Sequence, residues 1–321
     1  MIAFVFPGQG AQYVGMGVEL AARYASSRRA FDEASESTGL DLLDLCRTGP
    51  EERLRRTENT QPAILTCSWA TASALAENGV RPAMTAGLSL GEYTALVAAG
   101  ALTLADAVSL VRQRGKFMQD AVDGQHTAMA AVMGLPAERV DEICRQTPGV
   151  VEVANFNAPG QVVIGGEAGA VEDAAARLLA AGARRVTRLA VSAPFHTSLM
   201  APAAARLSAA LGRVNVAPAR IPVVANVTAQ PVQEPNEIRT ALLDQVAAPV
   251  RWEQSVRTLR ALGASVFVEV GPGTALAGLI RRTVPGAVVV SVQDQATLDA
   301  ALSVLEPVTA SPEQGHAESR R

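Results

Sequence analysis

A serine held between glycines is the residue in this chain best suited to do chemistry. The segment Gly87-Leu-Ser-Leu-Gly91 follows a short apolar run and precedes a helical pattern, so it predicts a sharp strand-to-helix turn. Glycine suits these positions because a Cβ would clash within such a turn. The turn would expose the Ser89 hydroxyl at a helix N-terminus, which favours a nucleophile for acyl transfer. An ordinary glycine-flanked turn is the alternative interpretation.

A serine nucleophile needs a base, and the chain has three histidines. His316 lies in a polar C-terminal stretch, and His126 lies in a segment that predicts a boundary loop. His196 follows an expected strand, and α/β sheets place their sites at the carboxyl ends of strands. We therefore expect His196 to be the base, with a purely structural histidine as the alternative.

Acyl transfer also needs N–H donors for the oxyanion that forms on the attacked carbonyl. The backbone N–H of Leu90, directly after Ser89, is the expected first donor. Gln9 is the expected second donor, because Gly8-Gln-Gly10 forms a tight turn at the end of the first expected strand.

Composition narrows the function classes. The chain has 321 residues, is 49% hydrophobic and carries a formal net charge of −3, which fits one large domain or a domain with an inserted subdomain. No apolar run is long enough to predict a membrane span, and the apolar Met1–Phe6 reads as a buried strand rather than a signal peptide. The slightly acidic balance without a Lys/Arg block argues against nucleic-acid binding.

Three cysteines, Cys46, Cys67 and Cys144, lack the spacing of a metal site. Such a sparse, odd set predicts reduced, buried thiols in a cytoplasmic protein, with no metal.

Strand and helix patterns alternate along most of the chain, which predicts an α/β fold with a mostly parallel sheet covered on both faces. A βαββαβ order between the two halves of this pattern predicts an inserted ferredoxin-like subdomain at 125–192. Residues 1–124 and 193–307 then form the large α/β-hydrolase-like domain. The polar segment 308–321 predicts a disordered tail. The expected strands are 1–6, 84–87, 127–133, 150–155, 161–165, 185–191, 223–226, 265–270 and 287–292.

Eight motifs in order resemble the malonyl-CoA:acyl-carrier-protein transacylase family, which includes discrete fatty-acid enzymes and free-standing acyltransferases of polyketide synthases. The resemblance covers about residues 1–295. The motifs are Phe4-Val-Phe-Pro-Gly-Gln-Gly-Ala-Gln12, Gly87-Leu-Ser-Leu-Gly-Glu-Tyr93, Gln113-Arg-Gly115, Asn155-Phe-Asn-Ala-Pro-Gly-Gln-Val-Val163, Pro194-Phe-His196, Asn226-Val-Thr228, Pro249-Val-Arg-Trp252 and Glu269-Val-Gly-Pro-Gly273.

The resemblance implies a ping-pong reaction without a metal or redox cofactor. Ser89, with His196 as base, would take malonyl from malonyl-CoA and pass it to the phosphopantetheine thiol of holo-acyl carrier protein. The family orients its histidine with a carbonyl or amide rather than an acid, and Gln245 matches that glutamine. Asn155 and Asn157 match a loop that would support the His196 loop, or they are simple turn residues.

Arg114 matches the family's carboxylate-binding arginine and implies a dicarboxylic acyl group. Phe195, next to His196, implies plain malonyl, because its ring leaves little room for an α-methyl branch. Discrimination of one methyl group is limited to about 1–3 kcal/mol. Met118, one helical turn after Arg114, is expected to line the same pocket, with plain core packing as the alternative. Leu88 departs from the family's usual histidine, which is not the base; the change could alter acyl-chain tolerance.

Other functions stay open at this point. A proofreading hydrolase would use Ser89 and His196 without needing Arg114, and a transacylase for an unusual acyl chain is permitted by Leu88. A carrier-binding scaffold would not need an intact site. Fatty-acid and polyketide enzymes share the motifs, so the pathway stays open, and a monomer is the default oligomeric state. The candidate contacts for an acidic carrier protein are Arg184, Arg185, Arg188 and Arg281, with solvated surface charge as the alternative.

Overall fold

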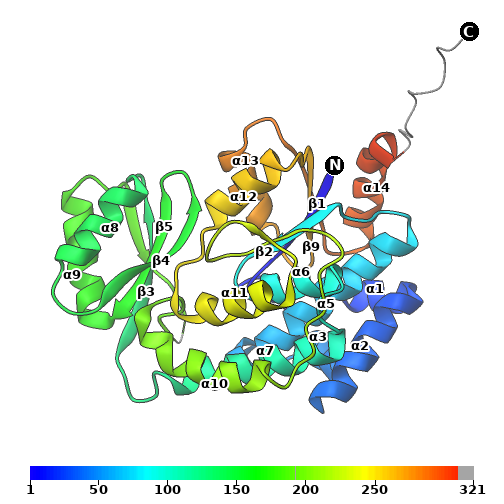
Figure 1. The fold of residues 1–321 in the computed structure, drawn as a ribbon, viewed down its shortest axis with the longest axis horizontal. Coiled ribbons are helices and arrows are strands. Elements are labelled where there is room, and N and C mark those ends of the chain that lie inside the picture. The colour runs from blue at the N-terminus through cyan, green and yellow to red at the C-terminus, as the bar shows by residue number, and fades with distance from the viewer. Residues whose placement is uncertain (192, 310–321) are drawn as a thin grey trace, which may run out of the picture.

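A six-stranded sheet forms the centre of the larger part of the molecule (Figure 1). The computed structural model describes residues 1–191 and 193–309. The strand order is β10-β9-β1-β2-β7-β8; the first five strands run parallel and β8 pairs antiparallel with β7. The expectation of a mixed α/β fold with a mostly parallel sheet is confirmed. The strands are β1 Ile2–Phe6, β2 Met84–Gly87, β7 Val223–Val224, β8 Pro231–Val232, β9 Val266–Val270 and β10 Val288–Val292.

Strand β1 lies inside this sheet, which explains why the chain begins with a continuous apolar run. Phe4 and Phe6 belong to the core on one face of the sheet, whereas Ala3 and Val5 belong to the core on the other face. Because helices cover both faces, every residue of β1 is buried.

Helices α12 Trp252–Ala261 and α13 Ala275–Thr283 cover the face on which Ala3 and Val5 lie. Thr103 caps α7, because its hydroxyl accepts a hydrogen bond from the N–H of Asp106 at 3.1 Å. The short 3-10 helix η1 spans Ser198–Met200. The helices packed against the face of Phe4 and Phe6 are α1 Val18–Arg23, α2 Ala25–Thr38, α3 Leu42–Thr48, α4 Glu51–Arg55, α5 Thr57–Glu77, α6 Leu90–Ala98, α7 Leu104–Asp120, α10 Ala201–Leu211, α11 Pro235–Ala247 and α14 Gln295–Thr309.

A second, four-stranded antiparallel sheet lies beside the first (Figure 1). Its order is β4-β5-β3-β6, with α8 and α9 packed on one face. Met129 and Val163 point from the other face, which is left open by these helices and turns toward the larger sheet. The elements are β3 Thr127–Met133, α8 Ala137–Gln146, β4 Val151–Ala158, β5 Gln161–Glu167, α9 Ala168–Ala180 and β6 Arg185–Arg188.

Several predicted boundaries are wrong. β6 ends at Arg188 rather than at residue 191, and β4 continues to Ala158 rather than ending at residue 155. The sequence interpretation missed β8 and α14 altogether. Helix α14 ends at Thr309, so it occupies the first two residues of the segment 308–321 for which disorder is predicted; residues 310–321 lie outside the described part of the chain.

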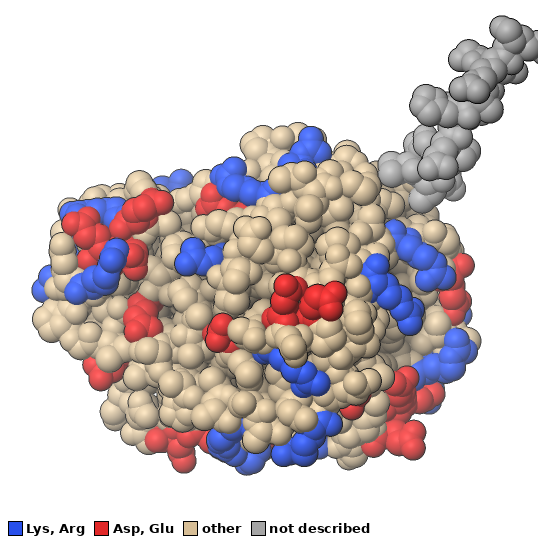
Figure 2. All heavy atoms as spheres, in the orientation of Figure 1, with Lys and Arg blue, Asp and Glu red and all other residues tan. Residues whose placement is uncertain are grey.

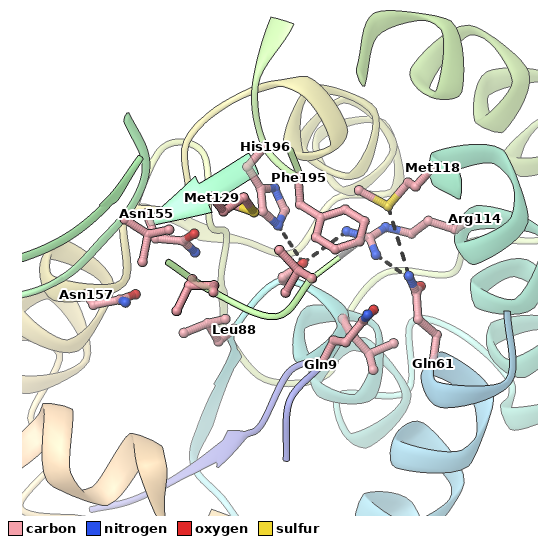
Figure 3. A pocket seen from close by; sticks show the side chains of 15 residues that line it. Gln9, Gln61, Leu88, Arg114, Met118, Met129, Asn155, Asn157, Phe195 and His196 are labelled. Atoms are coloured by element: carbon pink, nitrogen blue, oxygen red, sulfur yellow. Dashed lines mark hydrogen bonds between the residues drawn. The ribbon is translucent and has the colours of Figure 1, made fainter. Parts of the chain in front are cut away.

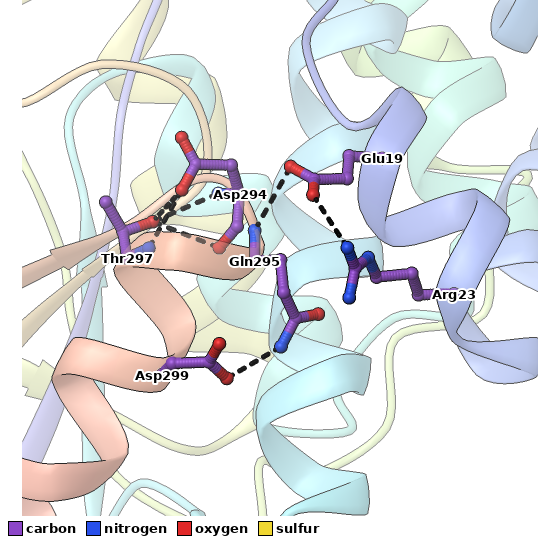
Figure 4. A network of polar contacts seen from close by, with 6 residues as sticks. All are labelled: Glu19, Arg23, Asp294, Gln295, Thr297 and Asp299. Carbon is purple, nitrogen blue, oxygen red and sulfur yellow. Dashed lines mark hydrogen bonds and ion pairs between the residues drawn. The ribbon is translucent and has the colours of Figure 1, made fainter.

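Helix α14 is tied to the start of the chain by a polar network (Figure 4). The Asp294 carboxylate accepts from the N–H of Thr297 at 2.9 Å, which caps the helix. The N–H of Gln295 donates to Glu19 of α1 at 3.5 Å, and Glu19 also pairs with Arg23. These contacts hold the first turn, while Leu298, Ala301 and Leu305, at helical spacing, bury the other side of the helix in the core.

The surface carries charges of both signs. On the face drawn in Figure 2, acidic and basic side chains are interspersed over both parts of the molecule. None of the helices in the described residues has the length and apolar character needed to span a membrane.

Candidate active site

The turn at Ser89 is a tight elbow in which the glycines are required. β2 ends at Gly87 and α6 begins at Leu90, while Ser89 itself has φ +53°, in the left-handed region. A Cβ on Gly91 would lie 2.1 Å from the carbonyl oxygen of Phe6, and one on Gly87 would lie 1.9 Å from the Gly91 backbone. Because both positions are glycines and carry no Cβ, the elbow can pack directly on β1.

The structure brings Ser89 and His196 together. Nε2 of His196 lies 2.7 Å from Ser89 Oγ, and Nδ1 lies 2.7 Å from the backbone oxygen of Gln245. A carbonyl only accepts, so Nδ1 carries the proton and Nε2 accepts from the Ser89 hydroxyl. The arrangement can therefore take a proton from Ser89, with a carbonyl in place of a carboxylate behind the ring.

The electrostatics of the site keep His196 neutral. Burial lowers the pKa of His196 to about 3, and the positive charge of Arg114 acts in the same direction, against the hydrogen bond to Gln245. At neutral pH the ring is unprotonated, which is the state in which Nε2 can act as a base.

Arg114 is a buried cation beside the nucleophile. Its side chain is 2% exposed, and its guanidinium donates to Ser89 Oγ at 3.1 Å, to Gln245 Oε1 at 2.8 Å and to Gln61 Oε1 at 3.0 Å. Among the ion pairs of the described residues none includes Arg114, and its Nε has no hydrogen-bond partner there. Since a buried charge is costly without an opposite charge in contact, this site is suited to an anion.

Two backbone donors near Ser89 are available. Within the described residues, no hydrogen bond is recorded from the backbone N–H of Gln9 or of Leu90. The loop that carries Gln9 packs on the elbow, because a Cβ on Gly8 would lie only 2.6 Å from the Leu88 oxygen. Both residues line the same cavity as Ser89.

This cavity, about 170 Å³ in volume, lies between the two sheets (Figure 3). The smaller sheet forms one wall with the open face that carries Met129. The residues that line it include Gln9, Leu88, Ser89, Leu90, Arg114, Met118, Phe195 and His196 from the larger part, and Met129, Asn155, Asn157 and Val163 from the smaller sheet.

The description of Asn155 and Asn157 as loop residues is wrong. Both lie on β4, which bridges to the larger part through the pairing of Asn155 with Val250 and the hydrogen bond from Phe156 N–H to the Val250 oxygen at 2.9 Å. Among the described residues neither side chain hydrogen-bonds to the His196 segment, and Asn157 Oδ1 has no partner. The strand extends beyond residue 155 because it stays paired with β5, where Phe156 pairs with Val162 and Ala158 with Gln161.

Sequence reasoning gave no role to three polar residues that hold the site. Gln61 binds Arg114 from α5, where no local motif marks it. Asn226 accepts from Ser89 N–H at 2.7 Å, and Glu92 accepts from Asn226 N–H at 3.1 Å. Asn226 and Glu92 both belong to motifs that this chain shares with the family, and this is the sequence signal that could have indicated a role at the site.

The candidate surface arginines are spread over both parts of the molecule. Arg185 and Arg188 lie on the edge strand β6, where Arg188 pairs with Glu172 at 3.2 Å. Arg281 lies on α13 and donates to the Val289 oxygen.

The cysteines are free thiols away from this cavity. Burial raises the pKa of Cys46 and of Cys144 to about 12 and that of Cys67 well above its usual value, so these thiols are poor nucleophiles. Among the described residues, no cluster of histidine, cysteine or acidic side chains is arranged to hold a metal ion.

Comparison with known proteins agrees with this geometry. The acyl transferase domain family matches residues 3–300. The malonyl CoA-acyl carrier protein transacylase of Bacillus subtilis (strain 168) is 43% identical over 308 residues, 95% of this chain and 97% of that protein.

Solved structures show the same similarity. The malonyl CoA-acyl carrier protein transacylase from Clostridium perfringens superposes with a TM-score of 0.93 at 40% identity, covering 96% of this chain and 98% of that one. A malonyl-transacylase in complex with its type II PKS acyl-carrier protein superposes with a TM-score of 0.91 at 43% identity, covering 94% and 99%. The chain therefore belongs to the acyl transferase domain family and, within it, to the malonyl CoA-acyl carrier protein transacylases.

Proposed function

We propose that this chain transfers a malonyl group from malonyl-CoA to the phosphopantetheine thiol of holo-acyl carrier protein. The observation that carries the proposal is the buried Arg114, which lacks an ion-pair partner among the described residues and lies 3.1 Å from the nucleophile Ser89 Oγ. A malonyl group on Ser89 would bring its free carboxylate to this guanidinium, whereas an acetyl group would leave the charge unmatched. The names of the relatives support the same acyl group.

The proposed reaction has two half-reactions that use the same residues. Ser89 Oγ attacks the thioester carbonyl while its proton passes to His196 Nε2, and the oxyanion accepts from the N–H groups of Leu90 and Gln9. The C–S bond breaks and the CoA sulfur takes the proton from His196. The carrier thiol then gives its proton to His196 and attacks the malonyl-Ser89 ester, and Ser89 recovers the proton as it leaves. Gln245 orients His196 throughout.

Each atom moved in this scheme comes from the two substrates, Ser89 and His196. A thioester is already activated for acyl transfer, so the proposed reaction requires no redox group, metal or other resident cofactor.

The cavity favours a small acyl group. Phe195 and Met118 both line it together with Arg114 and leave limited room for an α-branch. Leu88, which replaces the family's usual histidine, also lines the cavity and extends its apolar wall. We propose malonyl as the preferred group, with some leakage of methylmalonyl, because one methyl group changes binding by about 1–3 kcal/mol.

We further propose the finer division of the fold into an α/β-hydrolase-like domain, 1–124 and 193–307, and a ferredoxin-like subdomain, 125–192. The order β4-β5-β3-β6 with α8 and α9 on one face supports the second part of this division. The three free cysteines support a cytoplasmic location. We propose a monomer that binds neither nucleic acid nor membrane, which light scattering and binding assays can test.

Mass spectrometry of the intact protein tests the function. After brief incubation with malonyl-CoA, methylmalonyl-CoA or acetyl-CoA, we expect mainly a malonyl adduct, absent in Ser89→Ala, that moves to added holo-acyl carrier protein. An adduct lost to water without reaching a carrier would instead support the proofreading hydrolase. No adduct from any of the three would favour a transacylase for an unusual acyl chain, and rates with fatty-acid and polyketide carriers would separate the pathways.

Arg114→Ala tests the basis of the acyl preference. We expect the preference to shift from malonyl-CoA toward acetyl-CoA, whereas Arg112→Ala, on the same helix and bonded to the Thr38 oxygen, should leave it unchanged. An unchanged malonyl preference in Arg114→Ala would remove the role proposed for this residue.

A further inference from the structure

Glu92 is a buried carboxylate in the first turn of α6, three residues after Ser89. Its side chain is 1% exposed. One oxygen, Oε2, accepts from Gln245 Nε2 at 2.8 Å and from the backbone N–H of Asn226 at 3.1 Å. Both partners come from elements more than 130 residues further along the chain, so this carboxylate joins the elbow to the C-terminal half of the molecule.

Gln245 connects Glu92 to the reacting groups. Its Nε2 donates to the Ser89 backbone oxygen at 2.9 Å as well as to Glu92, its Oε1 accepts from Arg114 at 2.8 Å, and its backbone oxygen accepts from His196. If the amide were reversed, its oxygen would face the carboxylate and its NH2 group would face the guanidinium. The carboxylate on one side and the guanidinium on the other therefore select a single orientation of the Gln245 amide.

Asn226 connects Glu92 to the backbone of the elbow. Its Oδ1 accepts from the N–H of Ser89 at 2.7 Å, and its Nδ2 donates to the Gly87 oxygen at 2.7 Å. These two bonds hold Ser89 in its left-handed conformation, which no side chain of α6 itself does.

We propose that Glu92 is a positioning residue of this site: through Gln245 and Asn226 its carboxylate holds Ser89, His196 and Arg114 in their reactive arrangement, and the ionised carboxylate holds it better than the neutral acid. The inference rests on the proposed acyl transfer at Ser89. Glu92 does not touch the reacting atoms, and its effect passes through the two amides.

The protonation state of Glu92 gives the proposal a pH signature. Burial raises the pKa of Glu92 to about 7, against the hydrogen bonds from Gln245 and Asn226 and the charge of Arg114. The charged or titratable groups that act on this carboxylate are Arg114 from α7 and Tyr93 on its own helix; Gln245 from α11 and Asn226 after β7 are neutral. No ionisable side chain among the described residues of β1, β2, α5 and β7 shifts the pKa of Glu92. Because the pKa of His196 is about 3, Glu92 is the group of this site that titrates between pH 6 and pH 8.

The experiment measures the inactivation of Ser89 by phenylmethanesulfonyl fluoride between pH 6 and pH 8. This reagent reports on the Ser89–His196 pair whatever the natural acyl group is. For a group with a pKa of about 7, we expect the wild-type rate to rise about tenfold across this range. Glu92→Gln keeps an acceptor but cannot ionise, so its rate should stay at the low-pH level of the wild type at every pH. Glu92→Leu removes the acceptor and should be at least about threefold slower still at pH 8, where a lost hydrogen bond to a buried partner has its full effect.

Glu269→Gln is the matched control, because Glu269 is another buried glutamate with a raised pKa at the end of a parallel strand. It should keep the wild-type pH dependence. A rise in rate that persists in Glu92→Gln, or a wild-type rate in folded Glu92→Leu, would overturn the proposal. If Glu92→Leu does not fold, Glu92→Gln decides alone. The proposed malonyl transfer is judged separately by the wild-type adduct, so failure of either idea can be recognised.

Discussion

Two strand-to-helix corners of the large sheet each contain a buried glutamate, and the two carboxylates have different kinds of hydrogen-bond partner. At the corner between β9 and α13, Glu269 accepts from the backbone N–H groups of Leu276 and Ala277, at 3.0 and 2.8 Å, in the first turn of the next helix. At the corner between β2 and α6, Glu92 accepts from Asn226 and Gln245, which are 134 and 153 residues away. The first carboxylate caps a helix beside it, whereas the second joins distant segments.

The difference shows how one local chemistry yields two roles. A carboxylate at a helix N-terminus is favourable at both corners, because unpaired N–H groups and the helix dipole attract it. At β9–α13 the carboxylate meets that need itself. At β2–α6 the carboxylate accepts instead from the Gln245 side chain and from the backbone N–H of Asn226. The elbow is thereby linked to segments more than 130 residues away, whereas the most distant hydrogen-bond partner of Glu269 is Ser291 on β10, 22 residues away.

Enlarging the elbow should have the largest effect. In Gly91→Ala the new Cβ would lie 2.1 Å from the Phe6 oxygen, so we expect loss of the folded protein, or destabilisation by at least about 4 kcal/mol, with no acylation of Ser89. Urea denaturation followed by circular dichroism measures this. Gly278→Ala, in α13, meets open space and should raise the free energy of unfolding by about 0.5–1 kcal/mol. Equal stability of the two variants would contradict the requirement for glycine at the elbow.

Removing a side-chain amide at each corner should lower the activity only at the elbow. Gln245→Leu removes one hydrogen-bond partner from each of Glu92, Arg114 and the Ser89 backbone oxygen, so we expect kcat/KM for malonyl transfer to fall about 10- to 150-fold, equivalent to about 1.5–3 kcal/mol. Gln293→Leu removes an acceptor for Gly273 N–H at the other corner and should change kcat/KM less than about twofold. Similar losses in both variants would mean that the coupling is not specific to the elbow.

Truncating the capping glutamate should lower stability but spare the chemistry. Glu269→Leu leaves two buried backbone N–H groups unpaired, and we expect a loss of about 2–3 kcal/mol in the free energy of unfolding. Burst titration of Ser89 gives the activity per folded molecule, which should equal that of the wild type. A large fall in that quantity would show that this corner also supports the site.

The pH dependence of stability should also distinguish Glu92 from a side chain that cannot ionise. Burial raises the pKa of Glu92 from 4.5 to about 7, so between these values the folded protein binds more protons than the unfolded chain and loses stability as pH rises. Each pKa unit corresponds to about 1.4 kcal/mol, so the loss is up to about 3 kcal/mol. His196, with its lowered pKa, has the opposite sign and removes stability as pH falls from 6.5 toward 3. The difference between wild type and Glu92→Gln in urea denaturation at pH 5 and pH 7.5 isolates the Glu92 part, and no difference in slope would refute it.

The sequence predicts the features that depend on neighbouring residues. Gly87 and Gly91 around Ser89 predict the elbow, and the apolar run Met1–Phe6 predicts a buried strand. The structure brings His196, Arg114 and Gln245, which are far apart in the sequence, together beside Ser89.

The features that the sequence hides are made by distant partners. Gln61 faces Arg114 across 53 residues, and β4 bridges to the larger part of the molecule through Asn155 and Val250. No local period or motif reports such contacts, because tertiary pairing decides them.

The position of β1 in the large sheet has a consequence for folding during synthesis on the ribosome. This strand is made before both of its neighbours, and one of them, β9, Val266–Val270, follows it much later in the sequence. At about 5–20 residues per second, β1 waits roughly 10–50 s for that neighbour. His196 and Gln245 also emerge long after Ser89. A nascent chain therefore carries the serine elbow before its base has been made, and reactivity toward thioesters can begin only after Gln245 has emerged.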